Sequence, residues 1–375
     1  MVRVSTKRTD DEIDLCLISG SVAALSIGRA VRLLLSNQDG QSHFDPHFDG
    51  TNLKKDERDR ALGGILAPLL TGLIVVLALE LSRRAFRRRH LFSPSRAPLI
   101  TWDPSDYGIP ADAVREIEIT TPGRRALHGW YCAAKQPVAS VLFFHGNAGN
   151  LTNTAHVIPH LLAIGISVLM FDYAGFGKSG GRPDVSGVLE DGIAAARLHD
   201  ALRPPGVPSI AWGFSLGGAI AAEIVTRVRF DALILQSTFT SLRAMARLIF
   251  PKVALHRLSG NVLDTKSVLR RLNLPLLLIH GSEDEVVPHT MSRELFDAYG
   301  GPKTLHILEG RLHKDLFHRT PAEVIENVRQ FVLSLPPLRP DPIPASSSGR
   351  DSNDRSRAFW RRLVRRLEQL DPPSW

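Results

Sequence analysis

Short apolar runs alternate with longer helical runs over residues 110–335, and this alternation restricts the possible folds more than any other feature of the chain. Near-continuous apolar strands separated by helices predict a mostly parallel sheet with helices on both faces, and ligands bind at the carboxyl ends of such strands. We expect eight strands, at 116–120, 127–132, 140–146, 167–172, 209–214, 232–236, 275–281 and 304–308. We expect helices at 153–164, 186–202, 216–228, 289–298 and 321–334.

The net charge of +8 raises the question of nucleic-acid binding, but the charge lies at the two ends of the chain. Residues 101–330 carry about +1, whereas residues 1–100 carry about +4 and residues 331–375 about +3. A nearly neutral body argues against nucleic acid as a partner. Cys16 and Cys132 are too few and too far apart for a disulfide framework, and no metal-ligand cluster or dinucleotide fingerprint is present, so we expect no metal and no cofactor.

One motif lies between a predicted strand and a predicted helix. Gly213, Ser215 and Gly217 form a G-x-S-x-G sequence directly after the strand 209–214 and at the start of the helix 216–228. A nucleophile on such a sharp turn needs small neighbours, and the helix start directs free N–H groups toward it. Ser215 is therefore the predicted nucleophile.

A second motif follows the strand 140–146. His145, Gly146, Asn147 and Gly149 belong to the sequence HGNAGN, whose glycines let the backbone approach a ligand. The N–H of Asn147, paired with that of Leu216, is predicted to form the oxyanion hole for a tetrahedral intermediate. The alternative is a plain glycine-rich turn.

An acid and a base are expected after the last two strands. Asp284 follows the strand 275–281, and His313 follows the strand 304–308. The chain order serine, acid, histidine matches that of one class of hydrolases, in which the histidine takes the serine proton and the acid fixes its tautomer. Glu283 and Glu285 compete with Asp284 for the role of the acid.

Residues 110–335 resemble an alpha/beta hydrolase, and they are similar in particular to membrane-anchored alpha/beta-hydrolase-domain serine hydrolases, which are related to the protein depalmitoylases. The matching segments are HGWYCAAKQP, VLFFHGNAGN, FDYAGFGKSGG, WGFSLGGAIA, STFTSLRAMARLIFP, LLLIHGSEDEVVP and LEGRLHKDLF. The resemblance favours Asp284 as the acid. Ala174 and Phe214 depart from residues frequent in the family, so the substrate of the family is not carried over.

A run without charge extends from Ala61 to Leu79 and is followed by a cluster of arginines at 83–89. Such a run is long enough to span a bilayer core, which predicts a transmembrane helix at 61–82. The alternative is a buried helix of a soluble domain. We expect a variable region at 1–60, a basic juxtamembrane linker at 83–109 and, from the arginine count, a single-pass protein whose catalytic domain faces the cytoplasm.

The carboxyl-terminal end combines a linker and a basic helix. Residues 336–355 are rich in proline and serine and predict a disordered linker. Residues 356–371 place apolar side chains at helical spacing with arginines on the other face. This pattern predicts a basic amphipathic helix for an anionic membrane surface or a partner groove, and the alternative is a solvated tail helix.

The space between the strands 232–236 and 275–281 is enough for a small cap only. Residues 238–250 carry Phe239, Leu242, Met245, Leu248 and Phe250, which form an apolar wall for an acyl chain or simply pack on the sheet.

These features predict a membrane-anchored serine hydrolase that cleaves carboxylic esters or thioesters through an acyl-enzyme. Its expected partners are the acyl substrate and membrane lipid. A serine aminopeptidase is the alternative within the enzymes, since one scaffold hosts several chemistries. A non-catalytic membrane scaffold is the alternative outside them.

Overall fold

The computed structural model describes residues 69–337 apart from 79, 86, 88–90, 124, 251–261 and 320. The described residues after Gly72 belong to one compact unit. Residues 1–60, most of the linker predicted at 336–355 and the amphipathic helix predicted at 356–371 lie outside the described residues.

The unit is built on an eight-stranded sheet in the order β10-β9-β8-β7-β4-β6-β3-β2. All neighbouring strands are parallel except that β3 runs antiparallel to both β2 and β6. The mostly parallel eight-stranded sheet predicted from the sequence is thereby confirmed. The strands are β2 (Val114–Thr120), β3 (Ala126–Cys132), β4 (Ala139–Phe144), β6 (Ile166–Phe171), β7 (Ser209–Phe214), β8 (Ala232–Gln236), β9 (Leu276–Gly281) and β10 (Lys303–Leu308).

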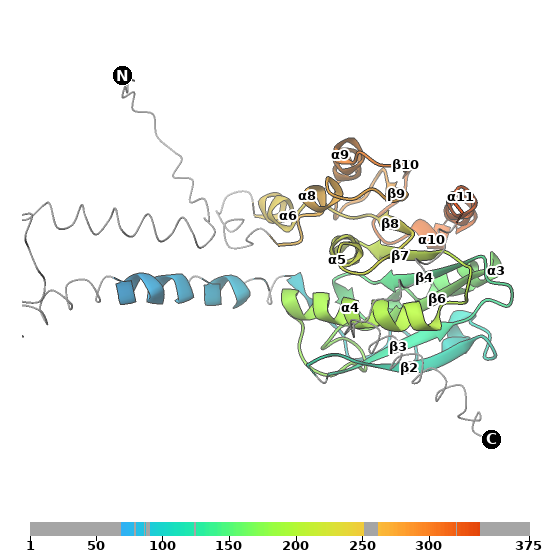
Figure 1. The fold of residues 1–375 in the computed structure, drawn as a ribbon, viewed down its shortest axis with the longest axis horizontal. Helices are drawn as coiled ribbons and strands as arrows, with labels where there is room; N and C mark the ends of the chain where they lie inside the picture. Colours follow the sequence, from blue (N-terminus) through green and yellow to red (C-terminus); the bar gives the residue numbers. More distant parts are fainter. Residues whose placement is uncertain are drawn as a thin grey trace, which may run out of the picture. The chain divides into compact units, whose positions relative to one another are not determined.

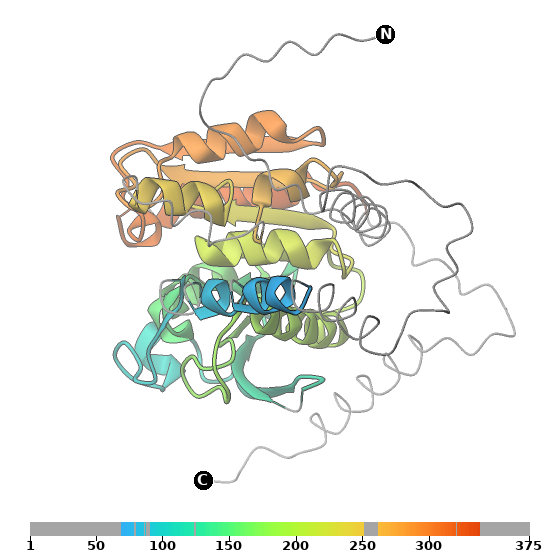
Figure 2. The ribbon, with the colours of Figure 1, turned by 90° about the vertical axis from the view of Figure 1, so that its left-hand side faces the viewer.

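Helices cover both faces of this sheet, and the sheet separates them in Figures 1 and 2. One face carries α4 (Val185–Leu202), α5 (Leu216–Val225), α6 (Leu242–Ile249), α8 (Thr265–Leu269) and α9 (Thr290–Ala298), and the other carries α3 (Ile158–Ala163), α10 (Leu316–Arg319) and α11 (Pro321–Leu333). The predicted helix at 153–164 is divided into η3 (Leu151–Asn153), η4 (Ala155–Val157) and α3.

The central strand β4 shows why the inner strands are largely apolar. Leu142 and Phe144 point into the core beneath α4 and α5, whereas Val141 and Phe143 point into the core beneath α3 and α11. Successive side chains of a strand alternate between faces, so a strand buried on both faces is mostly apolar, and the one polar side chain of β4, Ser140, is bonded to the buried His199.

The order of the strands determines where a site can form. Strand β4 is paired with β6 on one side and with β7 on the other, so the direction of chain progression reverses beside it. Phe144 at the end of β4 is the register partner of Gly213 near the end of β7. Leu308 at the end of β10 is likewise the partner of Gly281 at the end of β9. The loops after these four strands therefore leave the same edge of the sheet, where open α/β sheets bind ligands.

The amino-terminal part of the described chain is helical at residues 69–78 and 80–85. Its apolar side chains are exposed, with Leu70 at 56%, Ile74 at 63% and Val76 at 61%. Within the described ranges, no helix has both the length and the hydropathy needed to cross a membrane. Residues 61–68 and 79 of the predicted span lie outside those ranges.

Part of the segment predicted as a juxtamembrane linker, 83–109, packs into the folded unit. Leu91 and Phe92 are buried, and Tyr107 at the end of the short helix η2 (Pro104–Tyr107) is buried as well. Between them, β1 (Ser93–Pro94) pairs in parallel with β5 (Ala148–Gly149). From Leu91 onward this segment is thus part of the folded unit.

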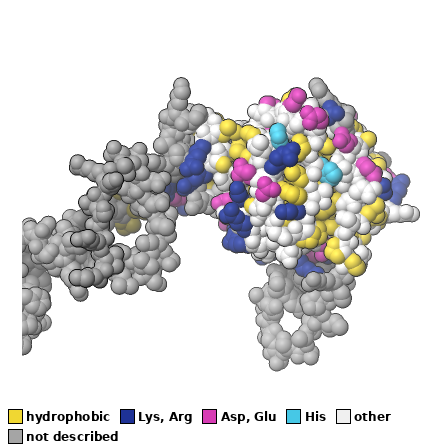
Figure 3. All heavy atoms as spheres, turned by 90° about the horizontal axis from the view of Figure 1, so that it is seen from above, with side chains coloured by type: hydrophobic (Ala, Val, Ile, Leu, Met, Phe, Trp, Pro, Cys, Tyr) yellow, Lys and Arg dark blue, Asp and Glu magenta, His cyan; other side chains and the backbone are white. Residues whose placement is uncertain are grey.

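The surface of the unit shows little segregation of charge on the face drawn in Figure 3, where acidic and basic side chains are interspersed with apolar ones. This agrees with the small net charge of residues 101–330. In the described part of the chain, no group of three or more His, Cys, Asp or Glu side chains is arranged to hold a metal ion.

Candidate active site

Ser215 lies on a strained turn between β7 and α5, with φ of 54° and ψ of −118°. A Cβ on Gly213 would lie 2.2 Å from the carbonyl oxygen of Gly217, and one on Gly217 would lie 2.0 Å from that of Phe144. Only glycine fits at either position. The G-x-S-x-G spacing is therefore a consequence of how closely the strand, the turn and the helix approach one another.

The backbone of Ser215 is fixed on both sides. Its N–H donates to the carbonyl of Gln236, at 2.8 Å. Its own carbonyl accepts a hydrogen bond from the hydroxyl of Thr238, at 2.7 Å. Both partners follow or end β8, the next strand of the sheet. The unfavourable φ at Ser215 persists because neighbouring structure holds it, as is usual for strained residues at functional sites.

His313 joins Ser215 to a carboxylate. Its Nε2 lies 3.1 Å from the Oγ of Ser215, and its Nδ1 lies 2.7 Å from the Oδ2 of Asp284. A carboxylate only accepts, so Nδ1 carries the proton and Nε2 is free to accept the serine proton. His313 is 4% exposed and Ser215 is 6% exposed, so the pair is almost shielded from water. The three side chains that the sequence predicts as nucleophile, base and acid are in hydrogen-bonding contact.

Four groups hold the carboxylate of Asp284. The Oδ1 accepts from the N–H groups of Val286 and Val287, at 2.9 and 2.7 Å. The Oδ2 accepts from His313 and lies 3.0 Å from Nε2 of His280. Burial alone would raise the pKa of Asp284, but the hydrogen bonds from His280, His313 and Val287 hold that pKa well below its usual range. Asp284 is consequently ionised and able to stabilise an imidazolium.

Glu283 and Glu285, the alternatives to Asp284 as the acid, are not bonded to the imidazole of His313. Glu285 accepts the backbone N–H of His313 at 3.1 Å through its Oε2, and Glu283 is exposed. Of the three neighbouring acids, Asp284 is the one bonded to the imidazole. Glu285 instead helps to hold the loop that carries His313.

The loop after β4 places Asn147 opposite the serine. The N–H-bearing residues Asn147 and Leu216 line the same cavity as Ser215. His145 is 1% exposed, and its Nδ1 donates to the carbonyl of Gly146 at 2.8 Å. Burial lowers the pKa of His145 although Asp172 lies nearby, so the ring is neutral and Nδ1 is its protonated atom. Gly149 follows with φ of 77°, a value that favours glycine.

An apolar cavity of about 120 Å³ opens beside Ser215. Leu242, Met245 and Ala246 of α6 are buried and also line this cavity, so packing on the sheet does not exclude the predicted role of residues 238–250 as a wall for an acyl chain, which stays a prediction. Arg87 is the one charged side chain among the described residues that form its wall. The wall consists of Arg87, Leu91, Asn147, Ser215, Leu216, Phe239, Leu242, Met245, Ala246, Ile249, Phe250, Val286 and Val287.

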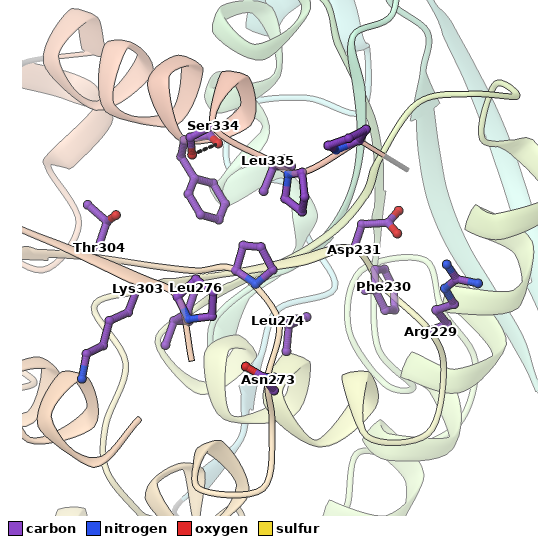
Figure 4. A pocket seen from close by; sticks show the side chains of 15 residues that line it. Arg229, Phe230, Asp231, Asn273, Leu274, Leu276, Lys303, Thr304, Ser334 and Leu335 are labelled. Carbon is purple, nitrogen blue, oxygen red and sulfur yellow. Dashed lines mark hydrogen bonds between the residues drawn. The ribbon is translucent and has the colours of Figure 1, made fainter. Parts of the chain in front are cut away.

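A larger cavity of about 620 Å³ lies at the amino-terminal ends of β8, β9 and β10 (Figure 4). Two of its charged side chains form hydrogen bonds within the fold. Asp231 accepts the N–H of Ser209 at 2.8 Å, and Lys303 donates to the carbonyls of Phe296 and Tyr299 at the end of α9. None of the predicted site residues lines it. The chemistry is therefore placed at the smaller cavity.

A second serine and histidine pair is present in the interior. Ser140 Oγ lies 2.8 Å from His199 Nε2, but both residues are 0% exposed and Ser140 is near the start of β4. Burial lowers the pKa of His199 to about 3, which keeps the ring neutral. A substrate has no access to this pair, so we assign it to the packing of α4 on the sheet.

The sequence Gly177-Lys178-Ser179 resembles the end of a phosphate-binding loop, but its side chains are used structurally. Lys178 pairs with Glu116 at 2.7 Å, and the buried Ser179 donates to the carbonyl of Asp172 at 2.7 Å. These contacts make the sequence a structural turn after β6.

Two contributors to the site were not identified from the sequence. His280 bonds Asp284, and its Nδ1 lies 2.6 Å from the hydroxyl of Ser292 on α9. Leu91 forms part of the cavity wall from within the predicted linker. The histidine directly before the G-S-E-D turn was a signal for the first, whereas nothing local in the sequence marks Leu91.

Comparison with known proteins agrees with this geometry. The family model described as "Serine aminopeptidase, S33" matches residues 135–270 and 254–319. Protein YfhR of Escherichia coli K12 is 31% identical over 249 residues, with 62% of this chain and 85% of that protein covered. The lysophosphatidylserine lipase ABHD12 of Rattus norvegicus is 29% identical over 217 residues, with 51% of this chain and 54% of that protein covered. The structure of the Pyrococcus furiosus esterase Pf2001 superposes with a TM-score of 0.55 at 22% identity, covering 65% of this chain and 98% of that one.

Fold and site together define a class of protein: the chain is an alpha/beta hydrolase with a serine, a histidine and an aspartate in hydrogen-bonding contact. Within this class it belongs to the serine aminopeptidase S33 family, as the match of the family model and the similarity to YfhR show. The resemblance to alpha/beta hydrolases noted in the sequence is confirmed at this level. The closer resemblance to membrane-anchored relatives of the depalmitoylases stays a prediction.

Proposed function

We propose that the protein hydrolyses carboxylic esters or thioesters that carry an apolar acyl chain, with Ser215 as nucleophile, His313 as base and Asp284 as the acid that orients the base. One observation carries this proposal. The hydrogen-bonded series Ser215, His313 and Asp284 opens onto an apolar cavity that Asn147 and Leu216 also line.

The first half of the reaction forms an acyl-enzyme. The Oγ of Ser215 attacks the substrate carbonyl carbon while its proton passes to Nε2 of His313. The carbonyl electrons move onto oxygen, which accepts hydrogen bonds from the N–H groups of Asn147 and Leu216. When the intermediate collapses, the bond to the leaving group breaks and the leaving oxygen or sulfur takes the proton from His313. Asp284 stays ionised throughout and stabilises the imidazolium.

The second half regenerates the serine. A water molecule gives its proton to Nε2 of His313 and attacks the acyl carbon, and the oxyanion again lies against Asn147 and Leu216. Collapse breaks the bond to Oγ of Ser215, which recovers its proton from His313. The products are the carboxylic acid and the alcohol or thiol, and no cofactor enters the reaction.

The cavity favours an acyl chain over the amino terminus of a peptide. Apart from the site residues Asn147 and Ser215, the described residues of its wall are apolar except for Arg87, which is bonded to Glu80 at 3.0 Å. A serine aminopeptidase must hold a protonated amine, for which carboxylates are the suitable partners, and the described residues of the wall include none. The rat relative is named a lysophosphatidylserine lipase, and an ester with one fatty acyl chain fits the same reasoning.

Labelling with a fluorophosphonate probe tests the nucleophile. We expect the wild-type chain to be labelled and Ser215→Ala to be unlabelled. Ser186→Ala, which changes an exposed serine in the first turn of α4, serves as the matched control and should label like the wild type. An unlabelled wild type, or equal labelling of Ser215→Ala, would reject the catalytic role and favour a non-catalytic scaffold.

A substrate panel tests the bond that is cleaved. We expect p-nitrophenyl octanoate and octanoyl thioesters to be hydrolysed faster than p-nitrophenyl acetate, and aminoacyl anilides to be poor substrates. Preference for the anilides would establish the aminopeptidase alternative.

We further propose that residues 61–82 hold the enzyme in a membrane with the catalytic domain on the cytoplasmic side. The charge-free run from Ala61 to Leu79 and the exposure of Ile74 and its apolar neighbours support this proposal. The arginines after the run support the orientation. Extraction of membranes with alkaline carbonate should leave the chain in the pellet, and a carboxyl-terminal tag in sealed inside-out vesicles should be open to protease. Release by carbonate would reject the anchor, and protection of the tag would reject the orientation.

The basic helix predicted at 356–371 is proposed to bind the same membrane surface. A peptide of residues 355–375 should bind vesicles that contain anionic lipid and lose binding when that lipid is replaced by zwitterionic lipid. Equal binding to both would reject an electrostatic role.

A further inference from the structure

Residues 91–97, here called the connecting segment, lie against the loop that supplies the oxyanion hole. The N–H of Ser93 donates to the carbonyl of Asn147 at 2.8 Å, and the N–H of Ser95 donates to the carbonyl of Gly149 at 2.8 Å. These bonds form the parallel pair β1 and β5. The segment that follows the exposed apolar helix is therefore hydrogen-bonded directly to the residue that presents the oxyanion donor.

These bonds help to fix the direction of the Asn147 N–H, because each peptide group is planar. Asn147 lies between two planar peptide groups, and its φ and ψ are the rotations between them. His145 holds the first group through the carbonyl of Gly146, which points opposite to the N–H of Asn147. Ser93 holds the second group through the carbonyl of Asn147. Because the peptide groups before and after Asn147 are both fixed, its N–H is held in a single direction.

The connecting segment is itself well anchored. The side-chain amide of Asn150 donates to the carbonyls of Ser95 and Ala97, at 3.2 and 2.7 Å. On its other side, Arg96 donates to the carbonyls of Gly177, at 3.1 Å, and Ser179. An edge-on contact between the rings of Phe92 and Phe176, with centroids 6.4 Å apart, adds packing. The connecting segment therefore bridges two loops at the carboxyl edge of the sheet.

The same segment reaches the substrate side. Leu91 is 9% exposed and forms part of the wall of the cavity beside Ser215. One short stretch of chain thus contacts both the oxyanion loop and the proposed acyl site.

We propose that the connecting segment is a positioning element of the oxyanion hole, so that the tether between the apolar helix and the catalytic domain sets the rate of acyl transfer. The inference rests on the proposed serine hydrolase function. Electrostatic stabilisation of an oxyanion depends on donors held in place before the charge develops, and small displacements of supporting groups are costly. Loss of the Ser93 bond frees the peptide after Asn147 and lets its N–H turn away.

The substitution Ser93→Pro tests this role in the full-length protein. Proline has no N–H, and its ring cannot be accommodated where nitrogen and oxygen are 2.8 Å apart. Ser93 is exposed, so its side chain contributes little packing. We expect kcat on p-nitrophenyl octanoate to fall at least about 10-fold while KM changes less than about 3-fold, since the loss is confined to the transition state. The affinity for a trifluoromethyl ketone, which forms a tetrahedral oxyanion on serine, should fall in parallel with kcat.

A matched control introduces proline elsewhere. Ala111 is exposed in the turn that the bond from Ala113 N–H to Pro110 closes, and proline suits this turn position. Ala111→Pro should retain the wild-type kcat. A folded Ser93→Pro variant with wild-type kcat, or one in which KM alone changes, would overturn the proposal.

A second variant keeps the test open if Ser93→Pro does not fold. Arg96→Ala removes an exposed side chain and its bonds to the 177–181 loop, and the exposed Arg182→Ala is its control. We expect about a 3-fold to 10-fold loss of kcat for Arg96→Ala alone, less than for a lost oxyanion donor. Equal rates for both arginine variants would overturn the proposal. If the wild-type chain neither reacts with fluorophosphonate nor cleaves esters, the proposed function is what fails.

Discussion

The Nε2 of His280 lies 3.0 Å from the Oδ2 of Asp284, the same oxygen that accepts from His313. Nε2 of His280 also lies 2.8 Å from the carbonyl of Val287, while its Nδ1 faces the hydroxyl of Ser292. Both neighbours of Nε2 are acceptors, so that atom carries the proton and the ring is a donor to Asp284. The buried imidazole of His280 therefore orients the carboxylate of Asp284.

Removing this donor should slow catalysis without weakening substrate binding. We expect His280→Gln to lower kcat about 10-fold with little change in KM, because the carboxylate of Asp284 loses a partner that orients it. Steady-state kinetics with p-nitrophenyl octanoate would measure this. His306→Gln, a half-buried histidine on β10, is the control and should behave like the wild type. Equal kinetics for both variants would show that His280 only packs.

Asp284 should be the one acid of its turn that matters for the reaction. Asp284→Asn is expected to lower kcat by about 10³-fold to 10⁴-fold, because the amide can no longer hold His313 as the Nδ1–H tautomer. Glu283→Gln changes an exposed carboxylate next to it and should leave kcat within about 2-fold of the wild type, as surface changes usually do. A comparable loss in both variants would contradict the assignment of the acid.

The close approach at the nucleophile turn predicts a large effect of one methyl group. A Cβ on Gly217 would meet backbone atoms that cannot move aside, whereas nothing lies within 4 Å of a Cβ on Gly300. We expect Gly217→Ala to destabilise the fold by about 3 kcal/mol in urea unfolding and to abolish labelling of Ser215. Gly300→Ala should stay within about 0.5 kcal/mol of the wild type. A stable, reactive Gly217→Ala would show that the turn is looser than described.

Local patterns were enough to predict some of this site, and long-range contacts explain the rest. The strand pattern of β4 and the motif around Ser215 involve residues adjacent in sequence, so periodicity and spacing identify both. The choice of Asp284 over Glu285 depends on how one turn points its side chains, which the residues alone left open. The bond from Ser93 to Asn147 joins positions more than fifty residues apart across a segment that has the composition of a linker, and nothing in that composition reveals it.

The buried His199 predicts how stability changes with pH. Burial lowers its pKa from about 6.5 to about 3, so between these values the unfolded chain binds a proton that the native chain does not. The native state therefore loses stability as pH falls below about 6.5. In urea unfolding, the wild type should lose about 2 kcal/mol more than His199→Gln between about pH 7 and about pH 5. The same loss in both proteins would mean that another group controls this range.

The cavity beside Ser215 predicts a selective effect of filling it. Ala246 is 6% exposed and lines the cavity, whereas Leu248 on the same helix is 47% exposed and does not. We expect Ala246→Phe to occupy the space for a long acyl chain and to lower kcat/KM for p-nitrophenyl octanoate by about 10-fold or more, a loss of about 1.4 kcal/mol or more. The value for p-nitrophenyl acetate should change less than about 3-fold, because a short chain does not reach the filled region. Leu248→Phe adds an aromatic ring to the same helix outside the cavity and should preserve the octanoate-to-acetate ratio. If the two substitutions changed that ratio equally, or if Ala246→Phe slowed both esters alike, the acyl chain would have to bind elsewhere.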